Sequence, residues 1–130
     1  MAQVKVVIAM NAFKGSMSSV LASSMVADGF SKGFREAHIV TAPMADGGDG
    51  TLEVLLKARN GIVETYTVTG PYGQFVEAPL GFIDGGKTAV IESAKCSGLA
   101  LPHVGKRDVR VAQSRGVGEL MVAAAEKGVK

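Results

Sequence analysis

The segment from Ala45 to Thr51 places two carboxylates among three glycines in the string ADGGDGT. Such a string fits a surface turn, a calcium loop, or a loop where backbone and acid both approach a charged ligand. An EF-hand loop needs acids at its third and fifth positions and a glutamate at its twelfth. Counted from Asp46, these positions hold two glycines and Lys57, so the calcium loop is excluded.

The position of ADGGDGT in the chain favours a ligand-binding loop. It lies between a predicted strand and a predicted helix, and ligands in open α/β sheets bind at the carboxyl ends of the strands. Glycines let backbone amides approach a ligand, while two carboxylates can hold Mg²⁺ or act as a base. The alternative is a turn in which Asp49 or Thr51 caps the helix, but such a turn needs only one Asp and one Gly.

A second glycine-bearing loop, NAFKGS at residues 11–16, follows the first predicted strand. Lys14 is a mobile point charge suited to a phosphate or a carboxylate, and Gly15 and Ser16 add a flexible amide and a hydroxyl. A lone lysine in a loop is usually only solvated. Two such loops follow two successive predicted strands, and this favours a role for Lys14 in binding a phosphate or a carboxylate.

A third string, GFIDGGKT at residues 81–88, matches the phosphate-loop pattern G-x-x-x-x-G-K-[ST]. That motif requires a helix after the loop, because the helix N-terminus and the loop amides hold the phosphates. Here Thr88 leads into AVIE, which reads as a strand, and DGG is ordinary hairpin chemistry. We therefore predict a hairpin turn and not a nucleotide site.

The elements that must position these loops follow from the apolar pattern. Strands are predicted over 4–9, 38–42, 62–69, 74–83 and 88–92, and helices over 18–34 and 52–59. A last helix is predicted between Ser114 as N-cap and Gly128 as the C′ residue. This order indicates an α/β fold. Leu21, Met25 and Phe30 have roughly helical spacing in the first helix.

Composition excludes several classes of function. The formal net charge is +2, and aromatic residues make up only 5%, which argues against nucleic acid or an anionic membrane as partner. No apolar run is long enough for a transmembrane helix. The single cysteine, Cys96, allows no internal disulfide, so a reducing, cytoplasmic location is expected. No activating partner is visible beside it, which favours an inert buried thiol.

The C-terminal residues Val129 and Lys130 stand where a β–α protein would begin its next strand. We read this as a segment of a longer protein; the alternative is a complete small domain with a frayed end.

Five blocks in order resemble the glycerate kinase family, in particular the type-I bacterial glycerate kinases. NAFKGS resembles the family's first loop, approximately PDSFKGS, and ADGGDGT resembles ADGGEGT with an acid-conserving change at Asp49. VTGPYG at 68–73, AVIESAKCSGLAL at 89–101 and SRGVGELMVAA at 114–124 resemble three further blocks. The blocks cover nearly the whole chain, so the resemblance is specific although no single block is.

The resemblance implies a fold with an open, largely parallel sheet, flanking helices and an inserted β-rich segment. Family members are two to three times as long and have two α/β domains. Residues 1–60 would then be a first α/β segment, 61–110 a β-rich segment of the second domain, and 111–130 a helix leading into a remainder. That remaining part of the chain would be a partner of this one, and the fragment alone would be inactive. The oligomeric state stays open, a homodimer included.

The implied activity is transfer of the γ-phosphoryl group of ATP to a hydroxyl of D-glycerate, with Mg²⁺. Lys14 would stabilise the phosphoryl charge or hold the glycerate carboxylate. Asp46 or Asp49 would accept the hydroxyl proton or hold Mg²⁺, and the sequence does not say which does which. The predicted substrate- and phosphate-binding residues are Ser16, Gly47, Gly48, Gly50, Thr51, Glu92, Ser97 and Ser114.

The chain departs from the family's sequence pattern at two places, and two alternative functions stay open. The family's first-loop Asp and Ser are Asn11 and Ala12 here, and an amide carries no charge for a metal. Gln113 and Arg115 are also not typical of the last block. The rivals are a non-catalytic α/β module that holds a small anion, and a kinase or phosphatase that acts on another hydroxy acid.

Overall fold

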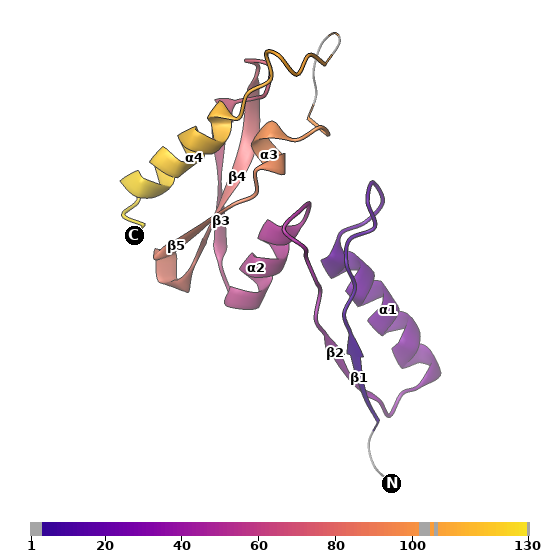
Figure 1. Ribbon diagram of the computed structural model, residues 1–130. Coiled ribbons are helices and arrows are strands. Elements are labelled where there is room, and N and C mark those ends of the chain that lie inside the picture. Colours follow the sequence, from indigo (N-terminus) through magenta and orange to yellow (C-terminus); the bar gives the residue numbers. More distant parts are fainter. Residues whose placement is uncertain (1–3, 102–104, 106, 130) are drawn as a thin grey trace. The chain divides into compact units, whose positions relative to one another are not determined.

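The computed structural model describes residues 4–101, 105 and 107–129 and divides the chain into two compact units (Figure 1). Unit 1 comprises Met1–Val54 and unit 2 comprises Leu55–Lys130, and each is described by itself. The three-part division predicted from the sequence stays a prediction. No helix in the described ranges has the length and apolar character to cross a membrane.

Unit 1 contains a β–α–β arrangement. Strand β1 (Lys5–Ile8) pairs in parallel with β2 (His38–Thr41), and helix α1 (Ser19–Gly33) connects them. Helix α2 (Thr51–Arg59) begins at the end of this unit. The predicted strands and helices are confirmed here to within a residue or two, because β-branched runs and a Ser N-cap mark their limits.

Helix α1 begins where the sequence predicts, but its apolar residues face outward. The Ser18 hydroxyl accepts a hydrogen bond from the Leu21 amide at 3.3 Å, which is N-cap geometry. The buried positions of α1 are Ser19, Ala22 and Ser23. Leu21 and Met25 are 51% and 55% exposed. The small residues allow a close approach of the helix within unit 1.

Unit 2 is built on an antiparallel sheet in the order β3–β4–β5. The strands are β3 (Ile62–Thr69), β4 (Phe75–Ile83) and β5 (Thr88–Ile91), so parallel and antiparallel pairing both occur in this α/β chain. The β4–β5 connection is the short 3₁₀ turn η1 (Asp84–Gly86), with positive φ at all three residues. The chain therefore enters β5 at Thr88 where a phosphate loop would need a helix, and the predicted hairpin is confirmed.

Helices α3 (Ala94–Ser97) and α4 (Arg115–Glu126) pack together against this sheet. The core that they share with β3 and β4 consists of Val68, Ala78, Leu80, Phe82, Cys96, Leu120 and Ala124. Burial in this core raises the pKa of the Cys96 thiol, which fits the inert role expected for it.

Both ends of α4 are well defined. At the C-terminal end, the Val129 amide donates to the Ala124 carbonyl at 3.3 Å and the Gly128 amide to Ala125 at 2.9 Å, with Gly128 at φ +82°. This is a Schellman motif, as predicted for Gly128. At the other end Ser114 is the N-cap residue, but its hydroxyl makes no capping hydrogen bond.

The first turn of α4 approaches the end of β3 so closely that only glycine fits at position 116. A Cβ atom on Gly116 would lie 2.5 Å from the carbonyl oxygen of Thr69. At Gly118, two residues on, a Cβ atom would meet nothing within 4 Å.

We expect Gly116→Ala to lower the free energy of unfolding of unit 2 by about 1–3 kcal/mol, because backbone must move to relieve the overlap. The matched Gly118→Ala should raise it by roughly 0.5–1 kcal/mol, since alanine is the better helix former. Urea denaturation of both variants checks this, and equal effects in the two would refute the close approach.

Candidate functional site

The first loop forms a tight turn that presents Lys14 at its tip. The Phe13 amide donates to the Met17 carbonyl at 3.0 Å, and the Ser16 amide donates back to Phe13 at 2.8 Å. Gly15 adopts φ +73°, a left-handed conformation that favours glycine. Lys14 and Ser16 are exposed. The turn thus holds an ammonium group and a hydroxyl in solvent after β1.

The second loop is shaped by Asp46 and two positive-φ glycines. The Gly48 amide donates to Asp46 Oδ1 at 3.1 Å, and the Thr51 hydroxyl donates to the Gly48 carbonyl at 2.8 Å. Helix α2 begins at Thr51, and the Thr51 hydroxyl donates to a carbonyl and does not accept from a helix amide in this bond. Gly47 and Gly50 have φ +93° and +90°, with open space where a side chain would project. A charged ligand can approach the backbone there.

The two loops meet because the parallel pairing continues beyond the strands. The Ala42 amide donates to the Ile8 carbonyl and the Met44 amide to Met10, each at 2.8 Å. The next side chains along the two segments then contact each other: Asn11 Nδ2 lies 3.5 Å from Asp46 Oδ2.

The Asn11 amide is itself held in place. Its Oδ1 atom accepts a hydrogen bond from the Ala12 amide at 2.7 Å, so its Nδ2 atom faces the Asp46 carboxylate. The sequence identified Asn11 only as a departure from the family pattern. The structure shows it to be the contact between the loops. Within the described residues, no ion pair joins Lys14 to Asp46 or Asp49.

The remaining predicted residues lie in unit 2. Glu92 is only 4% exposed at the end of β5, and Lys95 Nζ lies 3.6 Å from its Oε1 atom. This burial favours a structural role for Glu92, and its binding role stays a prediction. Ser97 at the end of α3 and Ser114 before α4 line one cavity of about 410 Å³.

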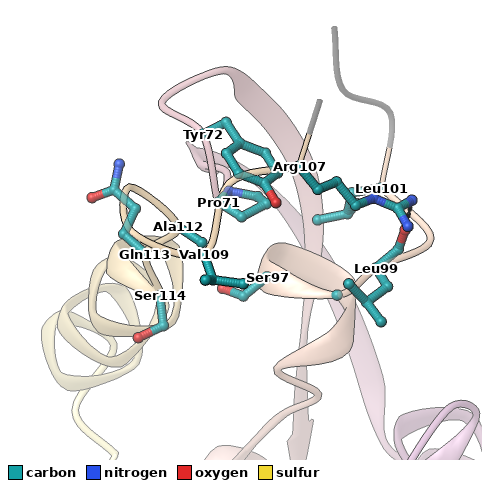
Figure 2. A pocket seen from close by; sticks show the side chains of 11 residues that line it. Pro71, Tyr72, Ser97, Leu99, Leu101, Arg107, Val109, Ala112, Gln113 and Ser114 are labelled. Atoms are coloured by element: carbon teal, nitrogen blue, oxygen red, sulfur yellow. Dashed lines mark hydrogen bonds between the residues drawn. The ribbon is translucent and has the colours of Figure 1, made fainter. Parts of the chain in front are cut away.

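Figure 2 shows this cavity between the β3–β4 turn, the end of α3 and the segment that leads into α4. The rings of Pro71 and Tyr72 lie on one side, and Ser97 and Leu99 lie opposite. The Arg107 Nη2 atom donates to the Leu99 carbonyl at 2.6 Å. The sequence did not predict that Tyr72 and Arg107 line a cavity, although Tyr72 belongs to the VTGPYG block.

The wall formed by the start of α4 is anchored to the end of β3. The Thr69 amide and hydroxyl donate to the Glu119 carboxylate at 2.7 and 2.9 Å, and Arg115 Nε pairs with it at 2.8 Å. The Gln113 amide donates to the Pro71 carbonyl at 2.9 Å. These contacts fix Gln113 and Ser114 beside the cavity.

The carboxylates of Asp46 and Asp49 are of a kind that can hold a magnesium ion. Across the part of the chain that the structure describes, no group of three or more His, Cys, Asp or Glu side chains could hold a metal. Mg²⁺ does not need such a group, since it is commonly held by one or two carboxylates together with substrate phosphates and water. Asp46 and Asp49 offer oxygen donors of that kind.

Comparison with known proteins identifies the family. The chain matches the profile of the Glycerate kinase family over residues 6–130. It is 44% identical to the Glycerate 2-kinase of Escherichia coli K12 and 42% identical to the Glycerate kinase of Bacillus subtilis 168, over 95% and 97% of this chain. A crystal structure described as a glycerate kinase 2 from Salmonella typhimurium LT2 matches with a TM-score of 0.81 at 35% identity, covering 98% of this chain. The resemblance seen in the five blocks and the α/β fold class are both confirmed.

The chain spans about a third of the length of these relatives: 32% of the first, 33% of the second, and 34% of the crystallised chain.

We expect Glu119→Gln to destabilise unit 2 most at neutral pH. The hydrogen bonds from the Thr69 amide and hydroxyl hold the pKa of Glu119 below its ordinary value of 4.5. A carboxylate with a lowered pKa adds stability above its unfolded pKa, and this is lost as the pH falls through the folded value. Urea denaturation at pH 7 and pH 3 should show a gap between wild type and variant that shrinks on acidification.

Glu126→Gln, in the last turn of the same helix, is the control. Its free energy of unfolding at pH 7 should differ less from that of the wild type. A Glu119→Gln gap that stays constant with pH would contradict the assigned hydrogen bonds.

Proposed function

Because the chain belongs to the glycerate kinase family, we propose that it forms part of an enzyme that phosphorylates a hydroxyl of D-glycerate with ATP and Mg²⁺. The observation that carries this proposal is the contact between Asn11 and Asp46, which joins the Lys14 loop to the ADGGDGT loop at the carboxyl edge of two parallel strands. That edge is where open α/β sheets bind ligands.

The loops offer the groups that phosphoryl transfer requires, which are mainly positioning and charge neutralisation. Lys14 supplies a mobile positive charge for the transferring phosphoryl group or for the glycerate carboxylate. Space is open at Gly47 and Gly50 where a side chain would project, so a ligand can come close to the chain there. Ser16 and Thr51 complete the loops as further binding residues.

Asp46 is the best placed acid for proton transfer. Its Oδ1 atom accepts a hydrogen bond from the Gly48 amide at 3.1 Å, whereas Oδ2 makes the longer 3.5 Å contact with Asn11. Oδ2 can therefore accept the proton of the attacking hydroxyl. As the new O–P bond forms, the bond between the γ-phosphorus and the bridging oxygen breaks, and ADP leaves. Mg²⁺, when held by Asp46 or Asp49, neutralises phosphate charge.

The protein is proposed to work in the cytoplasm, which agrees with its single, buried cysteine. The relatives are about three times as long, so we propose that the activity also needs the part of the family's sequence that lies outside this chain.

We expect Lys14→Ala and Asp46→Asn, made in a polypeptide of full family length that carries this sequence, each to lower kcat at least ~10²-fold, the cost of one lost catalytic group. Release of ADP in the presence of D-glycerate is the measurement. Lys32→Ala and Asp28→Asn on α1 are the matched controls and should keep kcat.

The same assay separates the rival functions. Turnover with a different hydroxy acid but not with D-glycerate would point to another kinase. Binding of glycerate without any ADP release would point to a non-catalytic module. Normal kcat in both loop variants would remove Lys14 and Asp46 from the site.

We expect Asn11→Asp to lower the Mg²⁺ concentration needed for half-maximal activity, because a second carboxylate would face Asp46 and attract the cation. A magnesium titration of the ADP-release assay measures this. Asn60→Asp, in the turn after α2, is the control. An unchanged or higher requirement in Asn11→Asp would argue against Asp46 as a metal ligand.

A further inference from the structure

A hydrogen bond joins the starts of helices α1 and α2. The Ser18 hydroxyl donates to the Oε1 atom of Glu53 at 3.2 Å. Ser18 is the N-cap residue of α1, and Glu53 lies in the first turn of α2. Both residues belong to unit 1. The bond therefore connects the two points at which the candidate catalytic loops end and their helices begin.

This bond and the contact between Asn11 and Asp46 enclose the two loops. Each of the two contacts joins residues that lie 35 positions apart in the sequence. Residues 11–18 therefore contain the Lys14 loop between two contacts, and residues 46–53 contain the glycines of the ADGGDGT loop between the same two. Each loop is held to the other once where its strand ends and once where its helix starts.

The Ser18 hydroxyl serves both helices at once. It accepts a hydrogen bond from the Leu21 amide at 3.3 Å while it donates its own proton to Glu53. One hydroxyl can do both, because it has one donor and two acceptor positions. A carboxylate in the first turn of α2 is also favoured by the dipole of that helix. Glu53 thus holds the residue at which α1 begins, and the Lys14 loop ends at that residue.

The contact at the strand ends is too long to fix the loops alone. Asn11 Nδ2 lies 3.5 Å from Asp46 Oδ2, which is longer than an ordinary N–H···O hydrogen bond. In the proposed reaction this Oδ2 atom takes up a proton, and a protonated oxygen is a weaker acceptor. A single contact also leaves the loops free to rotate about it. A second contact at the helix starts removes that freedom, and a displacement of about 1 Å at a reacting group can cost roughly 10²-fold in rate.

We propose that Glu53 is a positioning residue for phosphoryl transfer. Through its bond to Ser18 it keeps the Lys14 loop at a fixed distance from the ADGGDGT loop, and it acts on the reaction only through that bond. The inference rests on the proposed function for the reaction that is affected. The bond between the two helix starts does not depend on that function.

Enzyme kinetics test the proposal in a polypeptide of full family length that carries this sequence. Glu53→Ala should lower kcat for ADP release about threefold to tenfold, the value of one hydrogen bond. The KM for ATP should change little, because the groups of both loops are still present. Glu53→Gln should restore kcat, since an amide oxygen can accept the same bond. Glu36→Ala, which removes an exposed carboxylate from the turn between α1 and β2, is the matched control and should keep kcat.

A double-mutant cycle identifies the partner of Glu53. Ser18→Ala removes the donor together with the N-cap of α1, so its own effect on kcat combines two losses. The double variant Ser18→Ala/Glu53→Ala should have the same kcat as Ser18→Ala, because the bond between the two residues can be lost only once.

Limited digestion with trypsin gives a measurement that does not depend on activity. Trypsin cleaves after Lys14, which is exposed at the tip of the first loop. Glu53→Ala should raise the rate of cleavage at Lys14 in the folded protein about threefold or more, because the loop opens more often. Cleavage after Lys32, within α1, should keep its rate. Glu53→Gln and Glu36→Ala should be cleaved like the wild type.

Four results would overturn the proposal: an unchanged kcat in Glu53→Ala, a loss that Glu53→Gln does not restore, losses that multiply in the double variant, or equal cleavage at Lys14 in Glu53→Ala and the wild type. Failure of the proposed function is a separate result, which appears as no ADP release by the wild type with D-glycerate. The cleavage rates then decide by themselves whether Glu53 holds the loop.

Discussion

The parallel pairing of β1 and β2 is the interaction on which the candidate catalytic loops depend. It continues past both strands through the bonds from Ala42 to Ile8 and from Met44 to Met10. Each segment then turns into its loop at the same level, so that Asn11 faces Asp46. A shift of this register by one residue would turn one of these two side chains to the opposite face of the sheet.

Unit 2 uses a different constraint to hold its cavity open. The first turn of α4 is fixed to the end of β3 by the close approach at Gly116 and by the bonds between Thr69 and Glu119. The segment before α4 is thereby set opposite the β3–β4 turn, where the Gln113 amide meets the Pro71 carbonyl.

The two units present different groups. The loops of unit 1 carry Lys14, the carboxylates of Asp46 and Asp49, and glycines with open space where a side chain would project. The cavity of unit 2 is lined by aliphatic side chains together with Tyr72 and Arg107.

The sequence by itself determined the elements and the family. β-Branched runs, Gly128 and the DGG turn marked the strands, the end of the last helix and the hairpin, since these signals act within a few residues. Only the tertiary structure decided which groups meet. The outward face of Leu21 and Met25, the Asn11–Asp46 contact and the pairing of Arg107 with Leu99 depend on chain segments brought together by folding. Local patterns do not contain that information, because a side chain's partner is set by register and packing, and not by its own residue type.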